Sequence, residues 1–262
     1  MKVFILCGGS GTRLDELGKI IAKPMVRVGN KPLLIHIIEN FCIQGFKEFV
    51  LCTGHKHKTI ENYFLVEKKK YSKINKSKSN QLTVRYDDKK IKFNCEIIFT
   101  GHYNGTGGRV KIAYKKLKLK DDIIMTYGDG LSNVNINKLV NFHYKNNAMV
   151  TLTAVRPKVR YGVLKIQKNK VVYFDNSNQK KVDVYINGGF FVISKRTINY
   201  IQNKNIYWEQ QPLEKILKKK KIYAYKHRGY WQSLDTLKDQ NDLNKQFKQK
   251  KILWKFNENR KT

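Results

Sequence analysis

Acidic side chains are scarce in this 262-residue chain, in which 20 aspartates and glutamates stand against 53 lysines and arginines, a formal net charge of +33. Such a charge is typical of proteins that bind nucleic acid or anionic membranes. The excess, however, is mostly lysine spread along the whole chain, with dense runs only at 67–80 and 217–223. RNP, zinc-finger and helix-turn-helix patterns are missing, so we expect a solvated lysine-rich surface, weak binding to polyanions and no specific nucleic-acid partner.

Long apolar runs and paired cysteines are missing too. The first apolar run, at 3–7, is too short for the apolar segment of a signal peptide, and no later run approaches the length of a membrane span. The cysteines, Cys7, Cys42, Cys52 and Cys95, form no C-x-x-C pair. We therefore expect buried, reduced thiols and a soluble, cytoplasmic protein without membrane insertion.

Strand-like and helix-like patterns alternate from the start of the chain. A buried strand at 2–7 is followed by helical spacing over 30–45, a second strand at 48–54 and a short helix at 57–64. This βαβ opening predicts a parallel sheet whose ligand lies beyond the carboxyl ends of the strands.

Later elements continue the alternation without a repeat or a linker. The patterns predict strands within 81–100, a helix over 110–117, a strand at 122–130, a helix over 136–145, a strand at 148–155, a hairpin turning at 168–170, a strand at 185–194, a helix near Pro212, a strand at 222–226 and a last polar helix. With 41% hydrophobic residues, residues 1–262 are expected to form one α/β domain. Its predicted fold is Rossmann-like, with a mixed, mainly parallel central sheet flanked by helices and a small antiparallel region.

A glycine-rich stretch, LCGGSGTRLDELGKIIAKPM at 6–25, follows the first strand directly. Glycines let backbone N–H groups face an anion closely, and Arg13 and Lys23 supply cations that can grip phosphate. The stretch has no G-x-x-x-x-G-K-[ST] pattern, and Gly9-Ser10-Gly11 lacks the third glycine of the dinucleotide fingerprint. It therefore predicts a phosphate site other than these two common types.

Two aspartates follow elements that present ligands. Asp129 lies between glycines just past a predicted strand, which suits a Mg²⁺ ligand. Asp235, in the turn after Trp231, is equally compatible with the N-cap of the final helix and meets Asp129 only if the chain folds back.

The histidines receive no catalytic role. His36 lies between apolar neighbours on a predicted helix and is expected in the core or an interface. His55, His57 and His102 lie in loops without a carboxylate at metal-ligand spacing.

These residues closely resemble the sugar-1-phosphate nucleotidyltransferases, whose signature is GGxGTRLxPLTxxxPKP. The match begins with GGSGTRL and, after eight further residues, KPM, with Ala22 replacing the first proline of PKP. It continues almost to the end of the chain through GTGGR, TYGDG, INGGFFV, WEQQPL and YWQSLDTLKD. One branch of the family, the glucose-1-phosphate cytidylyltransferases, is similar in four further motifs, TGGR, INGGFFV, WEQ and WQSLDT. The resemblance implies the nucleotidyltransferase form of the fold.

The resemblance assigns roles residue by residue. It implies nucleotide binding by Leu6, Gly8, Gly9, Ser10, Gly11, Thr12, Arg13, Lys23, Asn104, Thr106, Gly107 and Arg109. It implies catalytic roles for Arg13, Lys23 and Asp129, sugar binding by Asn176, Asn187 and Gly188, and Mg²⁺ binding by Asp129 and Asp235.

The implied activity is Mg²⁺-dependent transfer of CMP from CTP to glucose 1-phosphate, giving CDP-glucose and pyrophosphate. The family's attacking phosphate is already anionic, so no general base is needed, and alignment and charge neutralisation drive the reaction. The resemblance also implies a homo-oligomer built from trimers, up to a hexamer, that supplies dideoxy sugars for surface polysaccharide such as the lipopolysaccharide O antigen.

One departure from the family concerns the sugar pocket. The family has F-x-E-K-P ahead of INGGFF, whereas this chain has Asn176 and Ser177 where the glutamate and lysine fall. Loss of a cation on a phosphate costs roughly 1.5–3 kcal/mol. Either Lys180 or Lys181 replaces it, or the sugar differs, or activity is weak. Two alternatives thus stay open: a nucleotidyltransferase for another sugar 1-phosphate or for UTP or dTTP, and a non-catalytic protein that binds nucleotides or polyanions.

Overall fold

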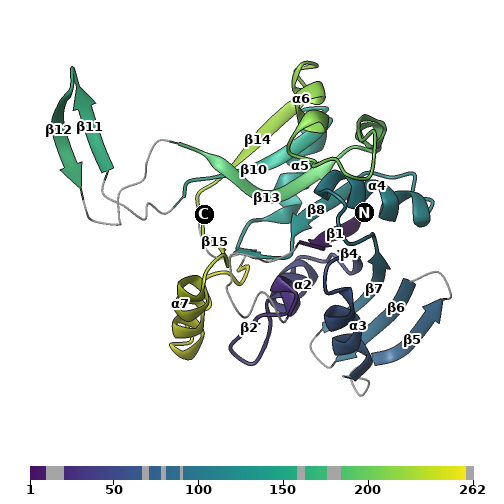
Figure 1. The fold of residues 1–262 in the computed structure, drawn as a ribbon. Helices are drawn as coiled ribbons and strands as arrows, with labels where there is room; N and C mark the ends of the chain where they lie inside the picture. Colours follow the sequence, from purple (N-terminus) through teal and green to yellow (C-terminus); the bar gives the residue numbers. More distant parts are fainter. Residues whose placement is uncertain are drawn as a thin grey trace.

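The computed structural model of the chain describes residues 1–9, 21–66, 71–77, 81–88, 91–157, 163–175 and 184–257. Its centre is a nine-stranded sheet in the order β14-β10-β13-β8-β1-β4-β7-β6-β5 (Figure 1). Strands β8, β1, β4 and β7 pair in parallel, and β13 and β6 run opposite to the other strands. This mixed, mainly parallel sheet confirms the predicted α/β fold class.

The strands of the main sheet are short, and all except β5 lie close to their predicted places. They are β1 (Lys2–Cys7), β4 (Glu48–Thr53), β5 (Tyr71–Ser77), β6 (Gln81–Asp88), β7 (Ile91–Phe99), β8 (Ile123–Tyr127), β10 (Val150–Val155), β13 (Ile186–Ile193) and β14 (Ile222–His227).

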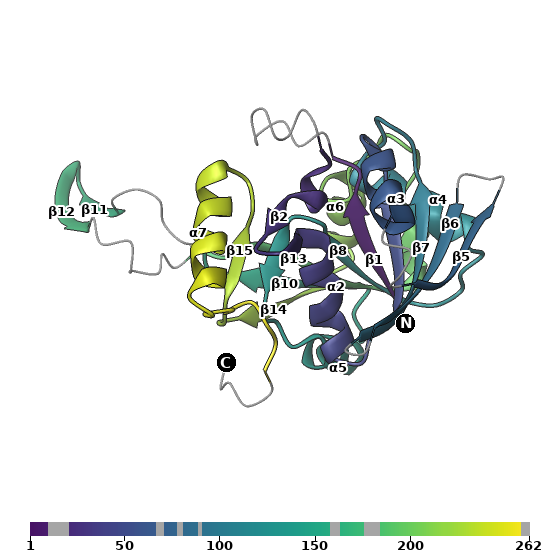
Figure 2. The ribbon, with the colours of Figure 1, turned by 90° about the horizontal axis from the view of Figure 1, so that it is seen from below.

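Three two-stranded sheets accompany the main sheet. They pair β2 (Arg27–Val28) with β3 (Lys31–Pro32), β9 (Gly130–Ser132) with β15 (Trp231–Ser233), and β11 (Val163–Gln167) with β12 (Lys170–Asp175). The last pair is the predicted hairpin, and Figures 1 and 2 both show it apart from the main sheet.

Helices cover both faces of the main sheet. Successive residues of β1 point to opposite faces, and both faces carry apolar side chains that the helices bury. Val3 and Ile5 belong to one apolar cluster, and Phe4 and Leu6 belong to another. The first cluster receives α2 (Leu33–Ile43), α3 (His57–Val66), α5 (Ile136–Lys145) and α7 (Leu237–Lys248). The second receives α4 (Thr106–Lys116), α6 (Gln211–Leu217) and the 3₁₀ helix η4 (Lys195–Tyr200), while the 3₁₀ helix η2 (Lys23–Met25) lies next to α2.

Two element predictions need correction. Helix α4 starts at Thr106, four residues before the predicted start, so part of the GTGGR motif is helical. Strand β5 lies within the lysine-rich run at 67–80, where no strand was predicted. Its lysines hid the pattern because an edge strand pairs on one side only and tolerates charge there.

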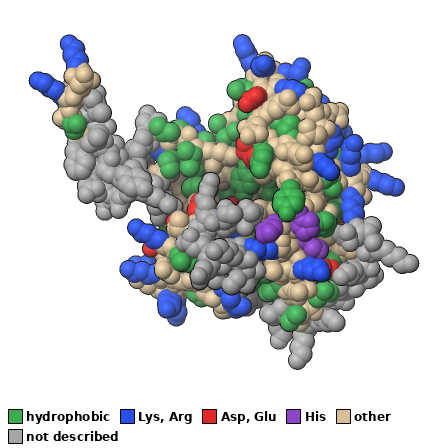
Figure 3. All heavy atoms as spheres, in the orientation of Figure 1, with side chains coloured by type: hydrophobic (Ala, Val, Ile, Leu, Met, Phe, Trp, Pro, Cys, Tyr) green, Lys and Arg blue, Asp and Glu red, His purple; other side chains and the backbone are tan. Residues whose placement is uncertain are grey.

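The cysteine and charge expectations fit the described residues. Cys7, Cys52 and Cys95 are buried, Cys42 is partly buried, and all four are free thiols. Lysines and arginines are scattered over the face drawn in Figure 3. Within the described ranges, every helix is too short or too polar to cross a membrane.

His36 lies in the core, as predicted, where it is expected to make the fold acid-sensitive. Its Nε2 lies 2.8 Å from the carbonyl oxygen of Val28, and its ring packs edge-on against Phe247 and Trp254. Burial lowers the pKa of His36 to about 4, although the Val28 hydrogen bond opposes the shift. The unfolded chain therefore binds this proton near its ordinary pKa of 6.5, well before the folded chain does, so stability falls as the pH drops from about 6.5 toward 4.

Replacing His36 by glutamine tests this assignment. His36→Gln is expected to be less stable than wild type at pH 7 but to lose about 1–3 kcal/mol less free energy of unfolding between pH 7 and pH 4.5. Urea denaturation at both pH values gives the comparison. His143 and His227, whose pKa values burial also lowers, keep some pH dependence in the variant. An unchanged loss between the two pH values would contradict the assignment.

Candidate active site

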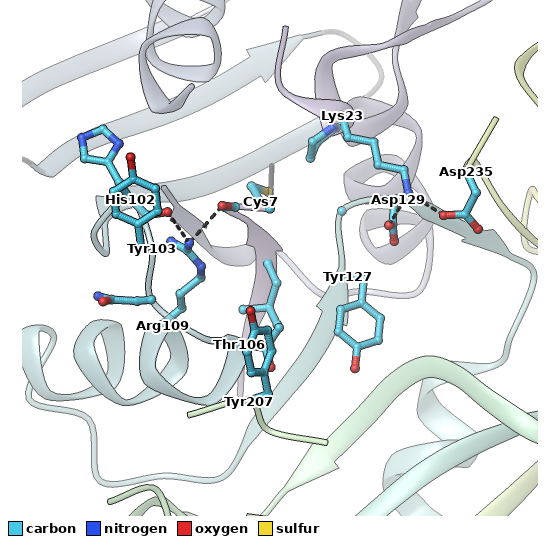
Figure 4. Close-up of a pocket in the computed structure, with 16 residues that line it drawn as sticks. Cys7, Lys23, His102, Tyr103, Thr106, Arg109, Tyr127, Asp129, Tyr207 and Asp235 are labelled. Atoms are coloured by element: carbon cyan, nitrogen blue, oxygen red, sulfur yellow. Dashed lines mark hydrogen bonds and ion pairs between the residues drawn. The ribbon is translucent and has the colours of Figure 1, made fainter. Parts of the chain in front are cut away.

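A pocket of about 650 Å³ lies at the carboxyl ends of the parallel strands β1 and β8, the edge at which the sequence predicted a ligand (Figure 4). Predicted site residues gather in it from five separate parts of the chain. Those that line it are Leu6, Gly8, Gly9, Lys23, Asn104, Thr106, Arg109, Asp129 and Asp235.

Lys23 lies between the two predicted metal ligands. Its Nζ is 2.8 Å from Oδ2 of Asp129 and 2.7 Å from Oδ1 of Asp235 (Figure 4). The lysine side chain is 13% exposed, and the aspartate side chains are 35% and 27% exposed. The three charges therefore form one cluster at the wall of the pocket, mostly shielded from solvent.

Asp129 is placed by a turn that requires glycine before it. The backbone N–H of Gly128 donates to the carbonyl of Leu6 at 3.0 Å, so the end of β8 stays beside the end of β1. A Cβ at position 128 would lie 2.7 Å from Cγ of Pro24. The missing side chain thus lets Pro24, and Lys23 before it, approach the turn that carries Asp129.

Asp235 meets Asp129 because β15 folds back along β9. Ser233 pairs with Gly130, and the backbone N–H of Leu234 donates to the carbonyl of Asp129 at 2.8 Å. The N-cap of α7 is Thr236, which forms a capping box with Asp239, so the N-cap interpretation of Asp235 is wrong. Asp235 instead directs its carboxylate to Lys23 and accepts a hydrogen bond from the Ser233 hydroxyl at 2.6 Å.

The electrostatic balance of the cluster favours a charged Lys23. Burial acts to lower the pKa of Lys23, but the charge of Asp129 and hydrogen bonds to both carboxylates outweigh it and raise that pKa. Lys23 is therefore an ammonium over the whole neutral pH range.

Arg109 organises the opposite end of the pocket. Its side chain leaves α4 and is buried, with only 4% exposed. The guanidinium donates to the backbone carbonyls of Gly8 (2.9 Å), Thr53 (3.2 Å), Gly101 (2.7 Å) and His102 (3.1 Å), and to the hydroxyl of Thr100 (3.0 Å). Burial lowers the pKa of Arg109. Its hydrogen bonds tie the loop after β1 to the loop after β7, and both Nη atoms donate to the protein itself.

Glycines around Arg109 are explained by close packing. A Cβ on Gly54 would lie 2.0 Å from Nη1 of Arg109, and a Cβ on Gly8 would lie 2.3 Å from the same atom. In the GTGGR motif, a Cβ on Gly108 would lie 1.9 Å from the carbonyl oxygen of Lys204. The motif therefore serves helix packing as well as the pocket.

A hydroxyl network joins the start of α4 to the end of β8. The hydroxyl of Thr106 donates to Oε2 of Glu209 at 2.7 Å, and the Tyr127 hydroxyl donates to Oε1 of the same carboxylate. Burial, and then the charge of Glu209, hold the pKa of Tyr127 far above its ordinary value, so the phenol stays protonated. Asn187 approaches the same phenol, with Nδ2 3.4 Å from its oxygen.

Other predicted residues lie beside the pocket or outside the described part. Gly107 packs against the backbone of Ile206, and Gly188 accepts a hydrogen bond from the Trp231 indole at 2.8 Å. Neither these two residues nor Asn187 lines the pocket. Ser10, Gly11, Thr12, Arg13 and Asn176 lie outside the described residues.

Sequence reasoning missed several residues that line the pocket. They are Cys7, Pro24, His102, Tyr103, Tyr127, Gly128 and Tyr207. Tyr127 and Gly128 belong to the quoted TYGDG motif, and Tyr207 directly precedes WEQ, so proximity to motifs was the available signal. The expectation that His57 lies in a loop is wrong, because it is the first residue of α3, where its Nε2 lies 3.5 Å from the Glu61 carboxylate.

Asp129 and Asp235 fit a divalent cation. One oxygen of each lies within 2.8 Å of the same nitrogen, so the two carboxylates converge on one point. Carboxylate oxygens suit Mg²⁺, which commonly takes one or two of them together with substrate phosphates. Across the part of the chain that the structure describes, no group of three or more His, Cys, Asp or Glu side chains is arranged to hold a metal. Phosphate oxygens would therefore complete the coordination.

Comparison with known proteins defines the class. A family model described as nucleotidyl transferase matches residues 2–250, and the chain belongs to this family. This membership confirms the predicted enzyme class, nucleotidyltransferase.

Curated relatives match over nearly the full length. The glucose-1-phosphate cytidylyltransferase of Salmonella typhi is 36% identical over 257 residues, which cover 97% of this chain and 99% of that protein. The probable glucose-1-phosphate cytidylyltransferase of Bacillus subtilis is 34% identical over 264 residues, with the same two coverages.

A solved structure supports the fold. HddC from Yersinia pseudotuberculosis, complexed with GMP-PN, aligns with a TM-score of 0.68 at 22% sequence identity. The alignment covers 94% of this chain and 99% of that one.

Proposed function

We propose that this chain transfers CMP from CTP to glucose 1-phosphate and releases pyrophosphate in a Mg²⁺-dependent reaction. The observation that carries the proposal is the cluster of Lys23, Asp129 and Asp235 in a pocket at the strand ends. The choice of CTP and glucose 1-phosphate is supported by the names of the two relatives that match nearly end to end.

The reaction joins two phosphates. An oxygen of the sugar phosphate attacks the α-phosphorus of CTP and forms a new P–O bond, while the bond from the α-phosphorus to the β-phosphate oxygen breaks. Pyrophosphate leaves with the electron pair of that bond, and no proton has to be removed from the attacking phosphate. The protein therefore has to align two polyanions and offset their repulsion.

Each end of the pocket suits one part of CTP. At one end, Lys23 would neutralise the reacting phosphates, and Asp129 and Asp235 would hold Mg²⁺, which supplies further charge neutralisation when bound. Arg13, which lies outside the described residues, is assigned to the pyrophosphate on the family resemblance alone. At the other end, the rings of Tyr103 and Tyr207, 91% and 52% exposed, offer stacking faces for a base. We therefore assign the aromatic end to the nucleoside and the charged end to the triphosphate.

We assign the sugar subsite to the region around Asn187 and Gly188, next to Tyr127 and beside the nucleotide pocket. Asn187 contacts the Tyr127 phenol, and the Trp231 indole fixes the neighbouring Gly188 carbonyl. Position 176, where the family carries a sugar-binding glutamate, lies outside the described residues. A nucleotidyltransferase specific for another sugar 1-phosphate, or for UTP or dTTP, is the second candidate, because Asn176 and Ser177 replace the family's Glu-Lys pair.

Pyrophosphate release tests the proposal. Purified protein with Mg²⁺ and glucose 1-phosphate is assayed separately with CTP, UTP, dTTP, ATP and GTP. We expect release with CTP, and only when the sugar phosphate is present. Turnover with UTP or dTTP alone would favour the second candidate, and CTP binding without turnover for any sugar 1-phosphate would indicate a non-catalytic binder.

Three further expectations belong to this proposal. We propose that residues 1–262 form one domain and that the protein is cytoplasmic. We also propose that it assembles into a homo-oligomer built from trimers, up to a hexamer. Analytical ultracentrifugation tests the assembly, and a sedimenting monomer at assay concentration would contradict it.

A further inference from the structure

Lys23 occupies the point on which the two metal-binding carboxylates converge. Its Nζ contacts one oxygen of Asp129 and one of Asp235 at 2.8 and 2.7 Å. An ammonium in this place satisfies the same oxygens that a divalent cation would need. The lysine and the cation therefore compete for one set of ligands.

The site also offers a cation little else. In the described ranges, no third His, Cys, Asp or Glu side chain joins the two aspartates to form a metal-binding group. With Lys23 present, its positive charge repels a divalent cation as well as blocking the oxygens. Both effects predict weak cation binding by the protein alone.

Nucleotide binding would change this balance. Lysine carries its charge on a flexible four-carbon stem, so Nζ can move without moving the backbone. Triphosphate oxygens in the same pocket offer Lys23 new acceptors and offer the cation the ligands that the protein lacks. Lys23 would then exchange the carboxylates for the phosphates.

We infer that Lys23 couples cation binding to nucleotide binding by holding the carboxylates until the triphosphate arrives. The inference rests on the proposed function, since it takes Asp129 and Asp235 as the Mg²⁺ ligands. By linkage, the cation tightens nucleotide binding by the same factor by which the nucleotide tightens cation binding. Lys23 thus has a role in the order of binding, apart from its contact with the reacting phosphates.

Mn²⁺ binding measured by electron paramagnetic resonance tests the inference without relying on activity. Without nucleotide, Lys23→Met is expected to bind Mn²⁺ at least about tenfold more tightly than wild type, because the competing cation is gone. Adding Asp129→Asn to Lys23→Met should abolish the gain. Lys31→Met, which breaks an ion pair with Glu39 outside the pocket, is the matched control and should bind Mn²⁺ as wild type does.

Calorimetry of CTP binding gives a second measure. The ratio of CTP dissociation constants without and with Mg²⁺ is expected to be larger for wild type than for Lys23→Met. Chelation of Mg²⁺ by CTP in solution is the same for both proteins, so the difference between the ratios comes from the protein. If Lys23→Met unfolds, as circular dichroism would show, Lys23→Gln replaces it.

The outcomes separate this inference from the proposed function. If the Lys23 variants bind Mn²⁺ no more tightly than wild type, while Asp129→Asn weakens Mn²⁺ binding in the presence of CTP, the coupling is overturned and the metal site stands. If Asp129→Asn leaves Mn²⁺ binding unchanged with CTP as well, the metal site itself is wrong and the inference falls with it.

Discussion

Asp129→Ala is expected to reduce turnover by at least about 10³-fold while the protein stays folded. The hydrogen bond that joins Asp129 to the end of β15 runs from the N–H of Leu234 to the backbone carbonyl of Asp129, so alanine keeps it. The Asp129 carboxylate instead accepts from Lys23. Its loss removes one of two carboxylates proposed to hold Mg²⁺ and one partner of Lys23. Charge stabilisation of several kcal/mol in the transition state corresponds to the predicted factor.

The measurement is pyrophosphate release at saturating CTP and glucose 1-phosphate, with urea denaturation to verify the fold. Asp121→Ala is the matched control, since Asp121 is exposed just before β8, whereas Asp129 lies just beyond its end. The control should keep wild-type turnover. An Asp129→Ala protein with turnover within tenfold of wild type would remove the metal assignment.

Arg109→Met is expected to have the second large effect, on stability and on nucleotide use together. The guanidinium satisfies four backbone carbonyls and one hydroxyl in a buried place. Methionine fills similar volume but donates no hydrogen bonds. The carbonyls of Gly101 and His102 lose the arginine as donor, while those of Gly8 and Thr53 keep only their hydrogen bonds from His55 and Thr100. This loss should cost at least about 3 kcal/mol of the free energy of unfolding. Release of the loops at Gly8 and Gly101 should also lower kcat/KM for CTP by about 10²-fold.

Arg109→Lys separates charge from geometry. It keeps the positive charge, but one ammonium cannot reach acceptors spread over two loops, so we expect little recovery. Arg196→Met, at an exposed arginine on η4, is the control and should leave both quantities unchanged. Full recovery by lysine would show that charge alone matters and would contradict the positioning role.

Much of the fold follows from local pattern. The continuous apolar run of β1 reflects a strand that is buried on both faces of the sheet. The apolar spacing of α2 reflects a helix that packs against the core, and both elements lie where the sequence predicts them. The start of α4 was misplaced because Gly107 and Gly108 are poor helix formers. Contact with the backbone at 204–206, distant in sequence, selects glycine there, and local propensity carries no record of that contact.

The sequence predicted which residue types form the candidate site, but not how the chain brings them together. Motif resemblance identified Lys23, Asp129 and Asp235, yet nothing local shows that β15 folds back along β9 to bring Asp235 to Lys23. Arg109, predicted to bind nucleotide, lines the pocket, but the sequence did not show that its guanidinium also holds four backbone carbonyls and the Thr100 hydroxyl. Glu209 was overlooked because its partners, Thr106 and Tyr127, are far from it in sequence.

The most direct test of the central claim is ³¹P NMR of a mixture of the purified protein, CTP, glucose 1-phosphate and Mg²⁺. A nucleotidyl transfer predicts loss of the CTP and glucose 1-phosphate signals, with equal growth of pyrophosphate and of two coupled diphosphate resonances from a nucleotide sugar. Formation of CMP and pyrophosphate with glucose 1-phosphate unchanged would contradict it, since water would then be the acceptor. An unchanged spectrum with active-site occupancy by CTP would contradict it as well.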